Sequence, residues 1–251
     1  MIATSAVLVV SAGLSQLGTA SAQAAVATCH GHRATIVARA GQKVIEGTNH
    51  RDVIVGNSQK NVIHGLGGDD IICAKDNADR IFAGSGDDRV WGQGGADVLL
   101  GGSGDDHLNP GPGTHSANIM NGGPGDDVLV SVDPDDAFWF KPFSAAGAPP
   151  VHVNLAAGTA TGQGHDTLRL TDQPSPEVDV PAGSVVHGTA YDDTMVGTGS
   201  VFYGGKGADL FYTSASVVHG GPGDDLFASS ASGTHKSSTM ALYGGPGNDK
   251  F

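Results

Sequence analysis

The sequence predicts an all-β protein of short stacked strands, and its composition and its repeats carry that prediction. Of 251 residues, 40 are glycine and only 16% are charged, a composition that favours turns. Hydrophobic residues make up 39% of the chain, which is too many for a wholly disordered protein. A nine-residue unit, in which a turn rich in glycine and aspartate precedes a short apolar segment, recurs along the chain. Repeating turns and strands therefore define the fold class.

The repeat begins at Gly47, and seven copies follow one another without a gap. The insertion "PGP" at 110–112 precedes three further copies, which end at Trp139. Position six of each copy carries a carboxylate or an amide: Asp52, Asn61, Asp70, Asp79, Asp88, Asp97, Asp106, Asn118, Asp127 and Asp136. Position eight is always apolar: Ile54, Ile63, Ile72, Ile81, Val90, Leu99, Leu108, Met120, Leu129 and Phe138.

Each unit has the residues of a turn followed by a strand. We expect the glycines at positions one, two and four to permit positive φ, so that turn carbonyls converge on the space that the position-six carboxylate enters. Oxygen ligands of this kind select a hard cation. The apolar residue at position eight faces inward, and its neighbours face outward. One unit buries little apolar surface, so we expect stability to come from stacking.

These units resemble the G-G-x-G-x-D-x-U-x nonapeptide of RTX, or haemolysin-type, calcium-binding proteins, for example "GLGGDDIIC" at 65–73. The resemblance implies a parallel β-roll, a right-handed β-solenoid in which two units complete one coil and calcium ions lie in the turns. Units two apart then lie above one another, with strands about 4.8 Å apart. Carboxylates at that separation repel by roughly 3 kcal/mol per pair unless cations neutralise them.

After Gly188 the register changes, because nine-residue units alternate with the seven-residue units "GTGSVFY" and "TSASVVH". Each coil shrinks to sixteen residues, and only the long turns carry aspartate, so calcium is expected on one edge of this block. The residues predicted to bind calcium in the whole chain are Asp52, Asn61, Asp70, Asp79, Asp88, Asp97, Asp106, Asp127, Asp136, Asp193, Asp209, Asp225 and Asp249.

The regions outside the repeats suggest export and a cap. Residues 1–18 are apolar and small and carry no charge, and A-x-A cleavage sites follow from Ala20. This pattern predicts a secretory signal peptide at 1–24, no membrane span in the mature chain and a secreted protein. An oxidising compartment favours a disulfide between Cys29 and Cys73, with two free thiols as the alternative. Residues 25–46 form the expected N-terminal cap, where Lys43 occupies the position-six place.

Three further segments complete the predicted organisation: a first repeat block at 47–139, a linking insert at 140–187 and a second block at 188–251. Within the insert, "VHVNLAAGTATG" at 151–162 is similar to a V-x-V-D-L-x-x-G-T-A-T-G segment that joins RTX blocks, and 171–184 is expected to be a loop. The chain is expected to be truncated, since no basic residue precedes the leader and the last unit stops at Phe251; if it is complete, end-to-end self-association is expected.

The sequence favours a structural function over catalysis. A net charge of -13 without clustered basic residues argues against nucleic acid as a partner. The catalytic motifs G-x-S-x-G and H-E-x-x-H are absent, so no enzyme is predicted. We expect a secreted calcium-binding protein with a structural, surface-associated or adhesive role and a cell-surface or polysaccharide partner. The alternative is the carrier, non-catalytic portion of a toxin or of a β-solenoid enzyme that acts on polysaccharide.

Overall fold

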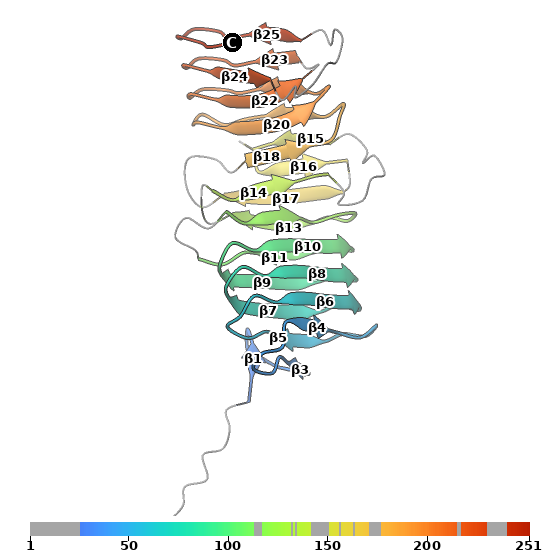
Figure 1. Ribbon diagram of the computed structural model, residues 1–251. Coiled ribbons are helices and arrows are strands. Elements are labelled where there is room, and N and C mark those ends of the chain that lie inside the picture. Colours follow the sequence, from blue (N-terminus) through green and yellow to red (C-terminus); the bar gives the residue numbers. More distant parts are fainter. Residues whose placement is uncertain are drawn as a thin grey trace, which may run out of the picture.

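The structure is a computed structural model in which the chain forms one column of stacked strands (Figure 1). It describes residues 26–112, 117–131, 133, 135–141, 151–155, 157–162, 164–170, 177–214, 217–229 and 240–251, and the signal-peptide prediction for 1–24 lies outside them. Every regular element within those ranges is a strand. They contain no helical segment that could span a membrane.

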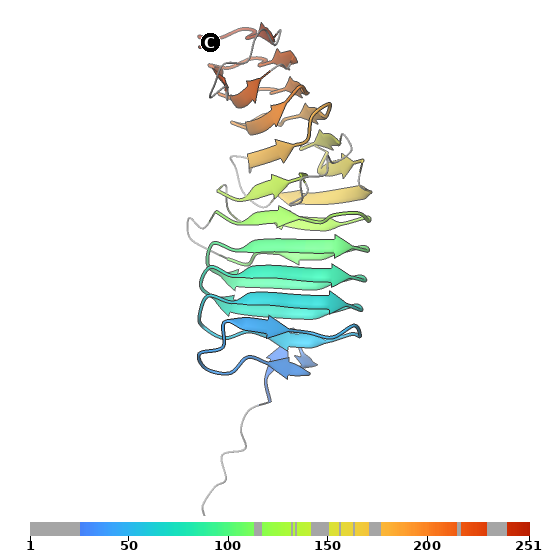
Figure 2. The same ribbon diagram turned by 45° about the vertical axis from the view of Figure 1, so that its right-hand side comes forward.

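Two stacked sheets form opposite faces of the column, with turns at both edges (Figure 2). In the described residues one sheet has ten strands: β4 (Val44–Glu46), β6 (Val62–Gly67), β8 (Arg80–Ser85), β10 (Val98–Ser103), β12 (Ile119–Asn121), β14 (Ala137–Trp139), β18 (Glu177–Val180), β20 (Thr194–Thr198), β22 (Leu210–Ser214) and β24 (Leu226–Ser229). The other, over the same ranges, has thirteen: β3 (Ile36–Val37), β5 (Val53–Val55), β7 (Ile71–Asp76), β9 (Arg89–Gly94), β11 (His107–Asn109), β13 (Val128–Ser131), β17 (His165–Leu170), β16 (Thr159–Thr161), β15 (His152–Asn154), β19 (Val185–His187), β21 (Val201–Tyr203), β23 (Val217–His219) and β25 (Ala241–Tyr243). Successive repeats alternate between the two sheets, so two repeats make a coil.

The strand register confirms the predicted β-solenoid. In the first block each residue pairs in parallel with the residue eighteen positions later, as Ile63 does with Ile81. The "PGP" insertion lengthens this step, since Leu99 pairs with Met120. In the second block the step falls to sixteen, because seven-residue units alternate with nine-residue units. Thr194 accordingly pairs with Leu210. The stacking of units two apart is therefore continuous through both registers.

The core is a single column of inward side chains between the sheets. All ten position-eight residues predicted to face inward are buried, from Ile54 to Phe138. In the second block this column contains Phe202, Phe211 and Phe227, whose rings pack on one another with centroids 6.3 Å and 5.2 Å apart. Because every coil contributes only two or three such side chains, apolar burial is spread evenly along the column and concentrated nowhere.

The insert at 140–187 continues both sheets. β13 pairs in parallel with β17, and β14 pairs in parallel with β18. β16 is antiparallel to both of its neighbours, which makes a hairpin within an otherwise parallel sheet. The expectation of a loop over 171–184 is wrong for 177–180, because the alternation in Glu177–Val180 buries Val178 and Val180 and forms β18, and 171–176 lie outside the described residues.

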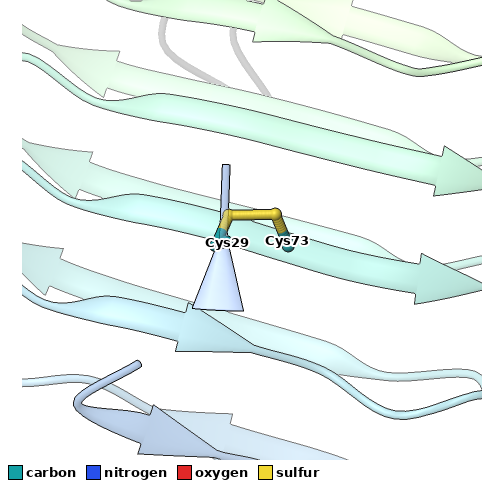
Figure 3. Close-up of a disulfide and its surroundings, with 2 residues drawn as sticks. All are labelled: Cys29 and Cys73. Carbon is teal, nitrogen blue, oxygen red and sulfur yellow. A yellow bond between two sulfur atoms is a disulfide. The ribbon is translucent and has the colours of Figure 1, made fainter. Parts of the chain in front are cut away.

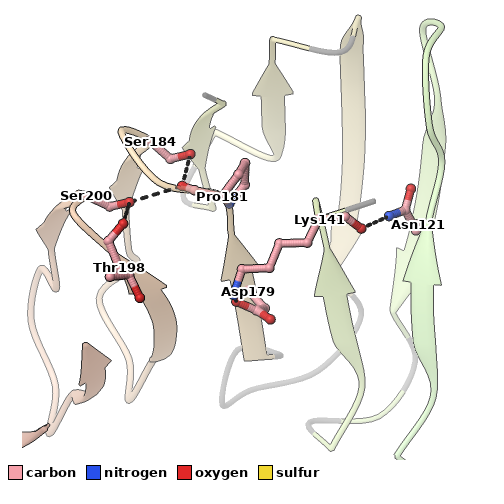
Figure 4. A network of polar contacts seen from close by, with 7 residues as sticks. All are labelled: Asn121, Lys141, Asp179, Pro181, Ser184, Thr198 and Ser200. Atoms are coloured by element: carbon pink, nitrogen blue, oxygen red, sulfur yellow. Dashed lines mark hydrogen bonds and ion pairs between the residues drawn. The ribbon is translucent and has the colours of Figure 1, made fainter. Parts of the chain in front are cut away.

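Polar contacts join the insert to the coils on either side of it (Figure 4). Lys141 pairs with Asp179, and its carbonyl accepts a hydrogen bond of 2.9 Å from the Asn121 side chain. The hydroxyls of Ser184 and Ser200 both donate to the Pro181 carbonyl, over 2.7 Å and 3.1 Å. These serines precede β19 and β21, where the first block carries aspartate, so buried hydroxyls take the place of carboxylates on the short turns.

The predicted disulfide between Cys29 and Cys73 is present and fastens the N-terminal cap (Figure 3). The antiparallel hairpin of β1 (Thr28–Cys29) and β2 (His32–Arg33) contributes Cys29 to a buried apolar cluster with Val53, Val55, Ile71 and Cys73. These are position-seven and position-nine residues, so the cap covers the outer face of the thirteen-stranded sheet. β4 contributes the exposed end of the ten-stranded sheet, and the adjacent Lys43 is exposed there.

Candidate metal sites in the turns

The turn backbone explains the glycines at positions two and four, and corrects our expectation for position one. Positive φ occurs at position two and position four of successive units, as at Gly102 (123°) and Gly104 (124°). Non-glycine residues adopt it where glycine is missing, for example Leu66 (80°) and Gln93 (75°). The position-one glycines do not have positive φ, so the backbone conformation does not explain them.

Glycine at position one leaves room for two oxygens that approach it, although Ala74 and Ala83 occupy this position in two units. A β-carbon placed on Gly65 would lie 2.5 Å from Asp70 Oδ2 of the same unit and 2.3 Å from the Ala83 carbonyl oxygen of the next stacked turn. A β-carbon on Gly204 would lie 2.1 Å from Asp209 Oδ2 and 2.5 Å from the Gly220 carbonyl oxygen. The missing side chain thus leaves a cradle between stacked turns that is lined by a carboxylate and a main-chain carbonyl.

The position-six side chains form hydrogen-bonded ladders along the edges of the column. On one edge, the main-chain N–H of Asp52 donates to Asp70 Oδ1 over 2.7 Å, and the same bond links Asp70 to Asp88, Asp88 to Asp106 and Asp106 to Asp127. The other edge follows the order Asn61, Asp79, Asp97, Asn118 and Asp136. Asp193, Asp209, Asp225 and Asp249 form a third ladder in the second block.

Position-five aspartates form a further ladder, in which the hydrogen bonds run in the opposite direction along the column. The main-chain N–H of Asp87 donates to Asp69 Oδ1 over 3.1 Å, and that of Asp105 donates to Asp87 Oδ1 over 2.9 Å. These carboxylates are exposed and line a groove together with Arg51 and Arg89. The two side-chain ladders therefore join adjacent turns by hydrogen bonds that run in opposite directions.

The second oxygen of most position-six carboxylates is buried without a hydrogen-bond partner. This holds for Oδ2 of Asp70, Asp79, Asp88, Asp97, Asp106, Asp127, Asp209 and Asp225. A buried carboxylate oxygen that accepts no hydrogen bond carries a desolvation cost that a proton or a cation must offset. The orphaned oxygens therefore mark where a cation would be held.

The pKa values of these carboxyls reflect the same cost. Burial raises the pKa of Asp70 from 3.8 to about 7 and that of Asp106 to about 8, although each accepts a main-chain hydrogen bond that lowers its pKa. Neighbouring aspartates add to the increase in both. In the second block, burial raises the pKa of Asp209 to about 7.

Several of the predicted residues have different surroundings. The Asp52 carboxylate accepts bonds from the Thr48 amide and hydroxyl at Oδ2, each 2.8 Å, and from the Thr35 hydroxyl at Oδ1. Asp193, which opens the second block, accepts bonds from the Thr189 amide and hydroxyl. Threonine at position two therefore supplies hydrogen-bond donors to the first carboxylate of each block.

At the remaining predicted positions, the side-chain oxygen of Asn61 accepts the Asn57 amide, and Oδ2 of Asp136 accepts the Asp133 amide. Asp249 is half-buried in the last turn. These three predicted residues accordingly lie within the ladders but differ from the carboxylates whose Oδ2 has no partner.

The prediction omitted Asp166, which the structure adds to the first edge. Its Oδ1 accepts the main-chain N–H of Asp127 over 3.3 Å, although the two residues are 39 positions apart. The signal was present in "GQGHD" at 162–166, which keeps the G-x-G-x-D spacing of positions two to six. The preceding hairpin hid this signal, because no complete nine-residue unit comes directly before it.

The donor set fits calcium. In the parts of the chain that the structure describes, no three His, Cys, Asp or Glu side chains cluster to hold a metal ion. The gap at Gly65 instead combines a carboxylate oxygen with a main-chain carbonyl oxygen, and Ca²⁺ takes oxygen ligands of both kinds. When bound, calcium would supply the positive charge that the buried Oδ2 atoms of residues such as Asp88 and Asp106 lack.

Fold and site together define a β-solenoid repeat protein whose turns carry ladders of carboxylates. Comparison with protein families finds four copies of the RTX calcium-binding nonapeptide repeat, at residues 46–76, 74–108, 113–131 and 185–216. The chain belongs to the proteins built from this repeat, and the resemblance seen in the sequence is confirmed. Among curated proteins, none matches the chain.

Proposed function

We propose that the protein is secreted and that its β-roll folds when it binds extracellular calcium. The observation that carries this proposal is the set of buried Oδ2 atoms without partners, eight of which lie in the described turns. Each coil has a thin core, and the ordering of one residue costs about 1–2 kcal/mol. Without cations, apolar burial per coil has to offset both this entropy and the carboxylate repulsion, so the calcium-free repeats are expected to be disordered.

We further propose a structural, surface-associated or adhesive role without catalysis. The aspartates of the described turns already accept main-chain hydrogen bonds from neighbouring turns, which supports a structural use for them. Export is supported by the apolar leader in the sequence and by the Cys29–Cys73 disulfide, which is typical of oxidising compartments. The corresponding partners are a cell surface or a polysaccharide.

A calcium titration followed by far-ultraviolet circular dichroism tests the coupling of folding to calcium. We expect little β signal in chelator and a cooperative gain near about 10⁻⁴–10⁻³ M calcium, the range of extracellular modules. Magnesium at the same concentrations serves as the control, since it demands octahedral geometry and gives up its water reluctantly. A full β signal in chelator at neutral pH would refute the proposal.

Assays of surface binding and catalysis test the proposed role. The calcium-loaded protein is incubated with uronic-acid polysaccharides and with whole cells, and both bound protein and released sugar are measured. Binding without depolymerisation is expected. Sustained turnover of a polysaccharide would instead favour the enzyme-associated alternative.

A further inference from the structure

We propose that four stacked rings on the outer face of the second block bind a linear, uncharged polysaccharide. The rings belong to His187, Tyr203, His219 and Tyr243, and together they form what we call the ring ladder. This assignment rests on the proposed function, which includes a polysaccharide partner. It adds the face that binds and the charge of the polymer.

The ring ladder follows the outer face of the thirteen-stranded sheet near the C-terminal end of the column (Figure 1). Each ring belongs to the last residue of its strand, and the parallel register of β19, β21, β23 and β25 stacks it on the ring of the strand below. Successive ring centroids are 4.7 Å, 5.0 Å and 4.7 Å apart, and the ring planes differ by 4°, 5° and 6°. Nearly parallel rings at these distances are offset, because carbon atoms in contact are about 3.5–4.0 Å apart, so neighbours cover only part of each face.

A row of apolar side chains runs beside the ring ladder and comes from the first residue of each strand: Val185, Val201, Val217 and Ala241. The surface is accessible, since Tyr203 is 38% exposed, Val217 37% and Tyr243 57%. At the other end of the same sheet, the hairpin of β1 and β2 covers the corresponding residues Val53 and Cys73, which are buried. The second block therefore presents openly a face that the first block partly covers.

The dimensions of this strip, which consists of the ring ladder and the apolar row, favour a ligand shaped like a chain. Strands of three residues make the strip about 10 Å wide, and four stacked strands make it about 20 Å long. Its area of roughly 200 Å² is far below the ~800 Å² that each partner buries in a stable protein complex. A second copy of this chain or another folded protein would find too little surface here, whereas a single polymer chain can lie along the strip.

The charge of the strip favours an uncharged polymer. Neither row contains Asp, Glu, Lys or Arg, although the chain as a whole carries a net charge of -13. A polyanion would be repelled by the net negative charge and would find no lysine or arginine on the strip to pair with. A polycation would find no carboxylate there. Electrostatic complementarity therefore selects a neutral ligand.

Sugars match the remaining chemistry of the strip. A pyranose ring presents C–H groups on its faces and hydroxyls around its edge. The valines and the uncovered parts of the rings offer apolar contact to the C–H groups, while the tyrosine hydroxyls and the imidazole nitrogens can donate and accept hydrogen bonds. Because the ring ladder advances by one coil at each step, successive units of a repeating polymer meet equivalent contacts.

Affinity electrophoresis of the full, calcium-loaded chain tests this assignment. Native gels contain amylose, glucomannan or hydroxyethyl cellulose as uncharged polymers, and alginate as a charged one. The wild type is expected to be retarded by at least one uncharged polymer. Tyr203→Ala should raise the apparent Kd for that polymer about tenfold, because it removes a ring and a hydroxyl from the middle of the strip. The matched control is Tyr212→Ala, which should match the wild type, since Tyr212 lies in β22 of the opposite sheet and is 43% exposed.

Exchange protection of β21 and β23 shows whether each variant folds. Tyr203→Phe keeps the stacked ring and removes only the hydroxyl, so it should raise the apparent Kd about threefold with unchanged protection. Mobility in alginate should be the same in the wild type and in all three variants.

A wild-type chain that no uncharged polymer retards would overturn the assignment. A wild-type Kd in Tyr203→Ala, or equal losses of affinity in Tyr203→Ala and Tyr212→Ala, would do the same. If folding still depends on calcium in those cases, the folding part of the proposed function stands. A full β signal in chelator would instead refute the proposed function, so the two failures are distinguishable.

Discussion

The main-chain N–H of Asp70 donates to Asp88 Oδ1 over 2.8 Å, which places the two carboxylates in adjacent turns although eighteen residues separate them. The other oxygen of each carboxylate is buried without a partner. The same side chain therefore stacks the turns through one oxygen and needs a proton or a cation at the other. This dual role makes the order of the turns and the occupancy of the gaps interdependent.

Removal of one orphaned carboxylate is expected to weaken calcium binding more than removal of a hydrogen-bonded one. Asp106→Asn should lose one ion and raise the calcium midpoint of folding by about tenfold, because ligand charge tunes affinity in such sites. Asp52→Asn is the matched control, since threonine donors already occupy its carboxylate. Calcium titrations of both variants, followed by circular dichroism, measure the difference. Equal midpoints would show that the orphaned oxygens are not the ligands.

Acid is expected to stabilise the calcium-free fold. Burial raises the pKa of Asp70 to about 7 and of Asp106 to about 8, above their ordinary value of 3.8. The folded state therefore binds more protons than the unfolded state between about pH 4 and pH 8, and its stability falls as pH rises through this window. In chelator, the β signal should be greater at pH 5 than at pH 8.5.

With calcium present, the calcium concentration at the midpoint of folding should rise as pH falls, because protons compete for the same oxygens. A midpoint independent of pH would contradict this linkage.

The two registers are expected to lose calcium in a definite order. The first block carries ladders on both edges, whereas the described part of the second carries aspartate on one edge and serine on the other. After addition of chelator, hydrogen exchange should become fast in β20, β22 and β24 before it does so in β7, β8 and β9. Simultaneous loss in both blocks would indicate that the column melts as one unit.

The disulfide is expected to stabilise the cap and the first coils only. Cys29 and Cys73 are 44 positions apart, and closing a loop of this size contributes about 3–4 kcal/mol. The double variant Cys29→Ser with Cys73→Ser should lose exchange protection in β1, β2 and β5, with a lower melting temperature for that region. Protection of β22 and β24 in the same molecules is the internal control, and unchanged protection of β5 would contradict the prediction.

Substitution of a residue with positive φ by glycine is expected to stabilise the loaded protein. Leu66 has a φ of 80° and is 47% exposed, so Leu66→Gly should relieve backbone strain with little loss of packing and gain about 1 kcal/mol. Gly102→Ala provides the opposite case, because its β-carbon would come 1.9 Å from the Gly84 carbonyl oxygen. Thermal unfolding in saturating calcium measures both. A destabilised Leu66→Gly would show that the leucine side chain contributes more than its exposure suggests.

The repeat by itself determined the strands and the inward residues, because a nine-residue period leaves only one alternation of turn and strand that buries position eight, and the resemblance to RTX proteins implied the pairing of units two apart. Ile72 and Phe211 lie in the core for that reason, and the shorter coils after Gly188 could be counted directly. The role of the position-one glycine could not be derived in this way. It depends on the approach of a carbonyl from the next turn, as Ala83 approaches Gly65, and such contacts exist only once the coils are stacked.

Tertiary structure alone decided where the non-repetitive segments join the column. Asp166 meets Asp127 because the β15–β16–β17 segment reverses direction within one sheet, and although "GQGHD" at 162–166 keeps the turn spacing, the hairpin has no nine-residue period that would place this turn in the stack. The cap likewise covers Val53 and Ile71 on the outer face, where the repeat places residues that would otherwise face solvent. Local spacing encodes contacts between neighbouring repeats, whereas contacts made by an insertion or a cap depend on chain reversals whose position is set by packing in three dimensions.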